Sequence, residues 1–213
     1  MKFGERNYPN TEVVSVTPDP PLHRCPLADV FRRARQLANA LTAAGVKPGD
    51  RIGTLAWNDY RHYELYCAVS CMGAVLHTVN PRLFPEQLEY IINHAEDRLL
   101  FVDATLLPVL AQVQGKIPCV EKVIVLTSDA AMPDTFDWPT LDERTACSLC
   151  YTSGTTGNPK GVLYSHRSTV LHAYASCMAD AVGVTGRDCV LAVVPMFHAN
   201  AWGLPYNAPM VGT

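Results

Sequence analysis

The sequence predicts an α/β fold with a largely parallel sheet and helices on both faces. Short apolar segments alternate along the chain with longer segments whose apolar residues recur every third or fourth position. The first pattern is typical of buried parallel strands and the second of amphipathic helices. With 213 residues, of which 48% are hydrophobic and 17% charged, the chain has enough apolar side chains for a packed core.

The N-terminal half contains a helix followed by a strand–helix–strand unit. Residues 27–44 carry apolar side chains on one helical face and arginines on the other. Residues 51–56 and 74–79 are predicted strands on either side of a helix at about 59–72, for which we expect Asn58 to be the N-cap. A unit of this length has a right-handed crossover between parallel strands.

A proline-rich segment precedes the first helix, and strands and helices continue to alternate after residue 80. Residues 1–26 hold five prolines, and their alternating residues 12–16 predict an extended lead-in or an edge strand. The elements that we predict after residue 80 are a helix from Pro85 to about His94, strands at 98–102, 122–126, 146–151 and 188–194, and helices at 104–114 and 166–182, the last capped by Ser165. Residues 127–145 are polar and irregular, which predicts a surface connection.

The most informative segment is the glycine-rich loop Tyr151-Thr152-Ser153-Gly154-Thr155-Thr156-Gly157-Asn158-Pro159-Lys160-Gly161. Free backbone N–H groups, hydroxyls and an ammonium group are the donors that a polyphosphate needs. The loop is not a Walker A motif, because Pro159 stands five residues after Gly154 where that motif requires glycine. Composition alone also fits a Ser/Thr/Gly surface loop.

The order of the residues resembles a known family. Tyr151–Gly161 looks like the phosphate loop of the AMP-forming acyl-CoA synthetases, within the adenylate-forming superfamily. Phe197-His198-Ala199-Asn200-Ala201-Trp202 resembles a second element of those enzymes. Residues 83–88 and 91–97 look like the fatty-acyl and medium-chain branch.

The resemblance implies a fold and an activity. Residues 1–213 would form part of the large N-terminal AMP-binding domain, and the mobile C-terminal lid would be absent. The full-length parent would use ATP to convert a medium- or long-chain fatty acid to an acyl-adenylate and then, with coenzyme A as co-substrate, to acyl-CoA. The alternative is a truncated, non-catalytic nucleotide-binding or interaction fragment. In either case we expect this chain alone to be inactive.

The resemblance also implies roles for individual residues. The ATP phosphates would be held by Thr152, Ser153, Gly154, Thr155, Thr156, Gly157 and Lys160. Thr152 would also lie near Mg²⁺, and the Ala199 backbone would lie near the nucleotide. His198 and Lys160 would serve the reaction, with His198 orienting the carboxylate or stabilising charge. Trp202 would lie at the acyl end of the site, where we expect its indole to face the acyl entrance and not bulk water.

Composition argues against several other classes of protein. A net charge of −3 gives no sign of nucleic-acid binding. The sequence has no apolar stretch long enough for a transmembrane helix and no secretory signal, so we expect a cytoplasmic protein. Its eight cysteines lack the spacing of a zinc site and are expected to be buried, reduced thiols. A homodimer is left open.

Overall fold

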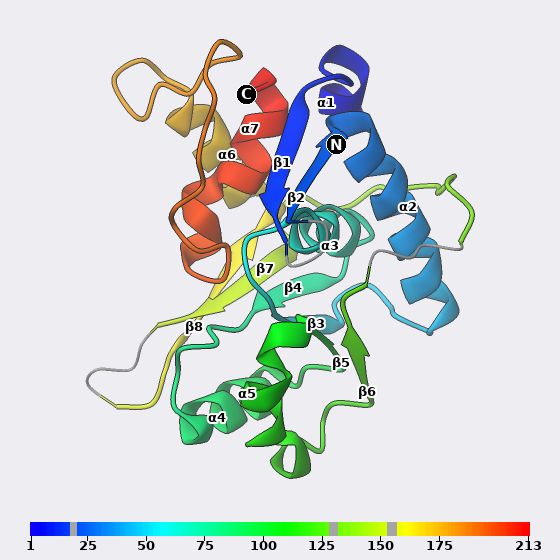
Figure 1. Cartoon of the computed structure of the whole chain (residues 1–213), viewed down its shortest axis with the longest axis vertical. Coiled ribbons are helices and arrows are strands. Elements are labelled where there is room, and N and C mark those ends of the chain that lie inside the picture. The colour runs from blue at the N-terminus through cyan, green and yellow to red at the C-terminus, as the bar shows by residue number, and fades with distance from the viewer. Residues whose placement is uncertain (18–20, 128–131, 153–156) are drawn as a thin grey trace.

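The computed structural model describes residues 1–17, 21–127, 132–152 and 157–213 (Figure 1). Its centre is a six-stranded sheet in the order β6-β5-β3-β4-β7-β8. The strands are β3 (Arg51–Leu55), β4 (Val75–Thr78), β5 (Leu99–Val102), β6 (Lys122–Val125), β7 (Ala146–Tyr151) and β8 (Gly161–Ser165). Every neighbouring pair is parallel except β7 and β8, which are antiparallel. The predicted α/β class with a largely parallel sheet is therefore confirmed.

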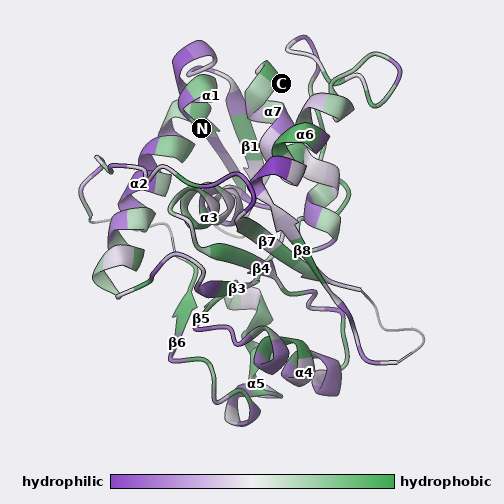
Figure 2. Ribbon diagram, turned by 180° about the vertical axis from the view of Figure 1, so that it is seen from behind, coloured by the Kyte–Doolittle hydropathy of each residue, from purple (hydrophilic) through white to green (hydrophobic). Residues whose placement is uncertain are grey.

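Helices cover both faces of this sheet (Figure 1). On one face lie α2 (Leu27–Ala43), α3 (Tyr60–Cys71), α6 (His166–Ser176) and α7 (Leu204–Val211). On the other lie α4 (Pro85–Ala95) and α5 (Leu107–Ala111). Since β4 and β5 are covered from both sides, all of their residues are buried, and Figure 2 shows β4 and β7 as mostly hydrophobic.

The N-terminal segment forms small elements outside the main sheet. Helix α1 (Lys2–Asn7) precedes an antiparallel hairpin of β1 (Glu12–Val16) and β2 (Leu22–Pro26). Of the two predictions for residues 12–16, an extended lead-in or an edge strand, the strand is confirmed. Neither α1 nor β2 had a clear periodic signal in the sequence.

Two predicted helices are shorter than expected. Residues 104–114 are divided into a 3-10 turn, η1 (Ala104–Leu106), then α5, and the start of a second 3-10 turn, η2 (Gln114–Lys116). The Asp103 carboxylate caps η1 by accepting a hydrogen bond from the Thr105 N–H, and Pro108 lies in the first turn of α5. Helix α6 begins after the predicted Ser165 cap but ends at Ser176, whose carbonyl accepts a hydrogen bond from the Gly183 N–H as the chain turns back.

The prediction of a strand at 188–194 is wrong. The segment pairs with no strand of the described residues, and Leu191 and Val193 are 85% and 79% exposed. The position beside β7 is occupied by β8, which the sequence did not indicate. The carbonyls of Ala192 and Val194 instead accept hydrogen bonds, both of 3.0 Å, from the Asn58 side chain. Asn58 is thus a loop anchor, and Asp59 caps α3 in its place.

The cysteines agree only in part with the expectation of buried, reduced thiols. All eight are free, but only Cys67, Cys147 and Cys150 are buried; four others are partly exposed and Cys189 is exposed. In the part of the chain that the structure describes, every helix is too short or too polar to cross a membrane.

Candidate functional site

Strand β7 connects the two motifs because its side chains alternate between the faces of the sheet. Ser148 and Cys150 face Asn200, which belongs to the second motif, at 3.0 Å and 3.3 Å. Leu149 packs instead with Val75 and Ala95, and the Tyr151 hydroxyl lies 2.6 Å from the Nδ1 atom of His94 on α4. The glycine-rich loop therefore leaves β7 with the His198 segment on one side of the sheet and α4 on the other.

The base of the glycine-rich loop is closed by two hydrogen bonds between Thr152 and Lys160. The Thr152 N–H donates to the Lys160 carbonyl at 3.0 Å, and the Lys160 N–H donates to the Thr152 hydroxyl at 3.1 Å. Both residues are exposed, as is Gly157, whose φ of 144° suits glycine. The predicted phosphate ligands Ser153, Gly154, Thr155 and Thr156 lie outside the described residues.

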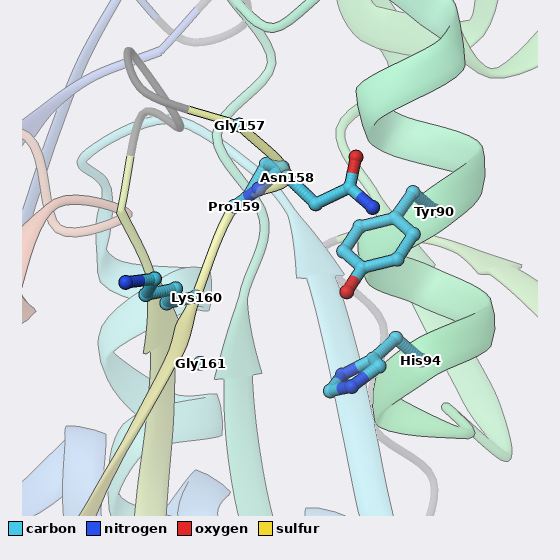
Figure 3. Close-up of a pocket in the computed structure, with 7 residues that line it drawn as sticks. All are labelled: Tyr90, His94, Gly157, Asn158, Pro159, Lys160 and Gly161. Carbon is cyan, nitrogen blue, oxygen red and sulfur yellow. The ribbon is translucent and has the colours of Figure 1, made fainter.

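A pocket of about 460 Å³ lies between this loop and α4 (Figure 3). Tyr90 and His94 form its helix side, with their rings stacked at 5.2 Å, and residues 157–161 form the other side. The Lys160 side chain points away from Tyr90 and His94 (Figure 3). The ammonium group of the loop is thus directed away from the α4 pocket.

Tyr151 fixes the start of the glycine-rich loop against α4. Burial raises the pKa of Tyr151 to about 12, so the phenol keeps its proton near neutral pH and can donate to His94. A Cβ on Gly161 would lie 3.2 Å from the Tyr151 ring, so glycine lets the ring pack closely against β8. Tyr90 and His94 were not predicted as site residues from the sequence. Their four-residue spacing on a predicted helix does place them on one face of that helix.

The second motif forms a left-handed turn at the end of a long loop. Four consecutive non-glycine residues, Ala199 to Trp202, have φ between 45° and 55°, and Gly203 follows at 80°. Together they form η3 (Ala199–Gly203). The left-handed conformation costs about 1–2 kcal/mol for each ordinary residue, so surrounding contacts must stabilise the turn.

The segment just before this turn is held by α3 and by the loop that precedes α3. The Met196 N–H donates to the Asn58 side chain at 2.6 Å, and the Met196 carbonyl accepts a hydrogen bond from the Tyr66 hydroxyl. His198 is exposed at the start of the turn. Trp202 is 64% exposed, contrary to the expectation that its indole is turned away from bulk water.

The predicted site residues do not form a closed catalytic cluster in this chain. Among the described residues, no hydrogen bond joins Lys160 to His198. The same residues contain no group of three or more His, Cys, Asp and Glu side chains placed to hold a metal ion. What the structure brings together is the base of the loop, β7 and the left-handed turn.

The chain also matches known proteins along nearly its whole length. The AMP-binding enzyme family matches residues 7–213. The chain is 51% identical to the 3-methylmercaptopropionyl-CoA ligase of Ruegeria lacuscaerulensis and 50% identical to the medium-chain-fatty-acid–CoA ligase of Ectopseudomonas oleovorans. Both alignments cover all of this chain, but only 43% and 42% of the two relatives.

A solved structure shows the same architecture. The anthranilate CoA ligase AuaEII, in complex with anthranoyl-AMP, superposes with a TM-score of 0.85 at 26% sequence identity. The superposition covers all of this chain and 43% of that enzyme. By sequence match and by fold, the chain belongs to the AMP-binding enzyme family.

Proposed function

We propose that this chain supplies the ATP phosphate loop and the adjoining acyl-side turn of an AMP-forming acyl-CoA ligase, acting on a medium- or long-chain fatty acid. The observation that carries the proposal is the closed base of the loop at the carboxyl end of β7, where α/β sheets place ligands. The names of the relatives, which include a medium-chain-fatty-acid–CoA ligase, support the substrate class.

In the proposed first step, a carboxylate oxygen of the acid attacks the α-phosphorus of ATP, and pyrophosphate leaves. Two anions must approach one another, so the site has to neutralise charge and align the reacting atoms. Lys160 would supply a cation to the phosphates, and the backbone and hydroxyls of residues 152–157 would donate hydrogen bonds. The Ala199 backbone would lie near the nucleotide, and His198 would orient the carboxylate.

In the proposed second step, the thiol of coenzyme A attacks the acyl carbonyl of the adenylate, and AMP leaves. Mg²⁺ bound with ATP would reduce the charge on the phosphates. The hydroxyl oxygen of Thr152 is a ligand of the kind that Mg²⁺ binds. The exposed Thr152 side chain fits that role, since its oxygen is engaged only as an acceptor from the Lys160 N–H among the described contacts. A cytoplasmic location stays a prediction.

Adenylate formation can be tested by ATP–pyrophosphate exchange. The assay uses saturated acids from short to long, with this chain and with an enzyme of the relatives' length that contains it. We expect exchange in the longer enzyme, greatest with medium or long acids, and none with the chain alone. Binding of ATP without exchange in either protein would favour the non-catalytic alternative, and exchange with short acids only would contradict the proposed substrate.

A further inference from the structure

Asn200 is a buried polar residue in the left-handed turn. Its side chain is nearly inaccessible, with the residue 5% exposed, although His198 and Trp202 on either side are exposed. The amide nitrogen donates to the Ser148 hydroxyl at 3.0 Å. The amide oxygen accepts a hydrogen bond from the Cys150 thiol at 3.3 Å, and it lies 3.2 Å from the Tyr66 hydroxyl, whose one proton is shared with the Met196 carbonyl. Both ends of the amide are therefore engaged away from solvent.

The contacts of this amide join segments that are far apart in the sequence. Ser148 and Cys150 lie on β7, which runs directly into the loop closed by Thr152 and Lys160. The Cys150 sulfur also lies 3.1 Å from the Thr78 hydroxyl at the end of β4. The Asn200 side chain thus ties the turn directly to β7 and, through Cys150, to the end of β4. Buried polar groups of this kind specify one arrangement, because any other leaves them without partners.

The backbone of Asn200 gives a second reason for asparagine at this position. Its φ of 51° lies in the left-handed region, which asparagine adopts more readily than most residues. Ala199, Ala201 and Trp202 share this conformation without that advantage. Local preference alone therefore does not hold the turn, and the contacts of the buried Asn200 amide contribute to holding it.

We propose that Asn200 is a positioning residue, which sets the turn carrying His198 and Trp202 in register with the strand that carries the phosphate loop. The effect of Asn200 on catalysis rests on the proposed function, because Asn200 would act by positioning His198 and would not touch the reacting atoms. The amide has no free polar atom to offer a substrate.

Two substitutions separate the amide from the backbone. Asn200→Gly keeps easy access to positive φ and removes the amide side chain with its hydrogen bonds, whereas Asn200→Ala removes the same hydrogen bonds and adds strain at positive φ. In an enzyme of the relatives' length that contains this chain, we expect Asn200→Gly to lower kcat for adenylate formation by about 10- to 100-fold, because reacting groups become misplaced. KM for coenzyme A should stay the same. Ser148→Ala should lower kcat in the same direction, and its effect should not add to that of Asn200→Gly.

A readout independent of turnover separates this inference from the proposed function. The chain has three tryptophans, so Trp57→Phe with Trp138→Phe leaves Trp202 as its only indole. In that background, Asn200→Gly should lower the fluorescence anisotropy of Trp202, because the turn is no longer fixed. An unchanged anisotropy, or a normal kcat in folded Asn200→Gly, would overturn the positioning role. A lowered anisotropy in a protein whose parent makes no adenylate would uphold that role and reject the proposed function.

Discussion

His62 should make the stability of this domain sensitive to mild acid. The side chain is fully buried in α3, with Nδ1 3.0 Å from the Trp57 carbonyl and Nε2 3.0 Å from the Thr54 hydroxyl. Because a carbonyl only accepts hydrogen bonds, Nδ1 carries the proton and Nε2 accepts from Thr54. Burial lowers the pKa of His62 from 6.5 to about 4, and the nearby Asp59 and Asp103 carboxylates only partly oppose that shift.

The sign and size of the effect follow from these two pKa values. Below pH 6.5 the unfolded chain binds a proton at His62, whereas the folded chain does so only near pH 4. The contribution of His62 to stability is therefore fully present above about pH 6.5 and is lost as the pH falls to about 4. At about 1.4 kcal/mol for each pH unit, the loss amounts to about 3 kcal/mol.

Urea unfolding between pH 4 and 7.5 measures this loss. His62→Gln keeps a polar side chain but cannot titrate, so its free energy of unfolding should fall less steeply with acid than that of the parent. His172→Gln, at an exposed position, is the matched control and should retain the parental slope. Equal slopes for the parent and His62→Gln would refute the assignment of a neutral, buried imidazole.

Three further predictions concern the site. Tyr151→Phe removes the 2.6 Å contact with His94 and should weaken ATP binding to the isolated chain about two- to tenfold. Unchanged affinity in calorimetry would show that this contact does not position the start of the loop. Trp202→Ala should alter the dependence of kcat/KM on acyl chain length while leaving Tm nearly unchanged, because the indole is 64% exposed; a uniform loss across the acids would argue against a gate. Gly203→Ala should cost about 1–2 kcal/mol or more in urea unfolding, since φ is 80° and its Cβ would lie 2.7 Å from His172; parental stability would contradict the positive φ.

Hydrophobic periodicity was sufficient to predict the buried strands of the central sheet, but not β8. The strands β3, β4, β5 and β7 are buried, and their apolar runs are continuous enough to be read directly. Local cap chemistry was predicted correctly at two helices: Ser165 accepts the Ser168 N–H at the start of α6, and Pro85 opens α4. It failed at α3, where Asp59 is the cap and Asn58 is not. These features depend on residues close together in the sequence.

The errors arose where distant partners decide the structure. Residues 188–194 are apolar enough for a strand, but their carbonyls bind Asn58, more than a hundred residues away, and β8 takes the place beside β7. Resemblance located His198 and Trp202, but the role of Asn200 depends on Ser148 and Cys150 across the fold. Hydropathy patterns do not indicate hydrogen bonds between residues that are far apart in the sequence.

The central claim is that residues 152–160 hold the phosphates of ATP, and titration calorimetry of ATP into the folded chain tests it most directly. Lys160→Ala removes the cation next to the loop closure. Lys47→Ala removes an exposed lysine that precedes the amino end of β3, whereas the glycine-rich loop follows the carboxyl end of the parallel strand β7. We predict that the parent and Lys47→Ala bind ATP equally, and that Lys160→Ala binds about tenfold or more weakly, as the loss of one charge-assisted contact requires. Equal affinity of the parent and Lys160→Ala would contradict the claim and place the phosphates elsewhere.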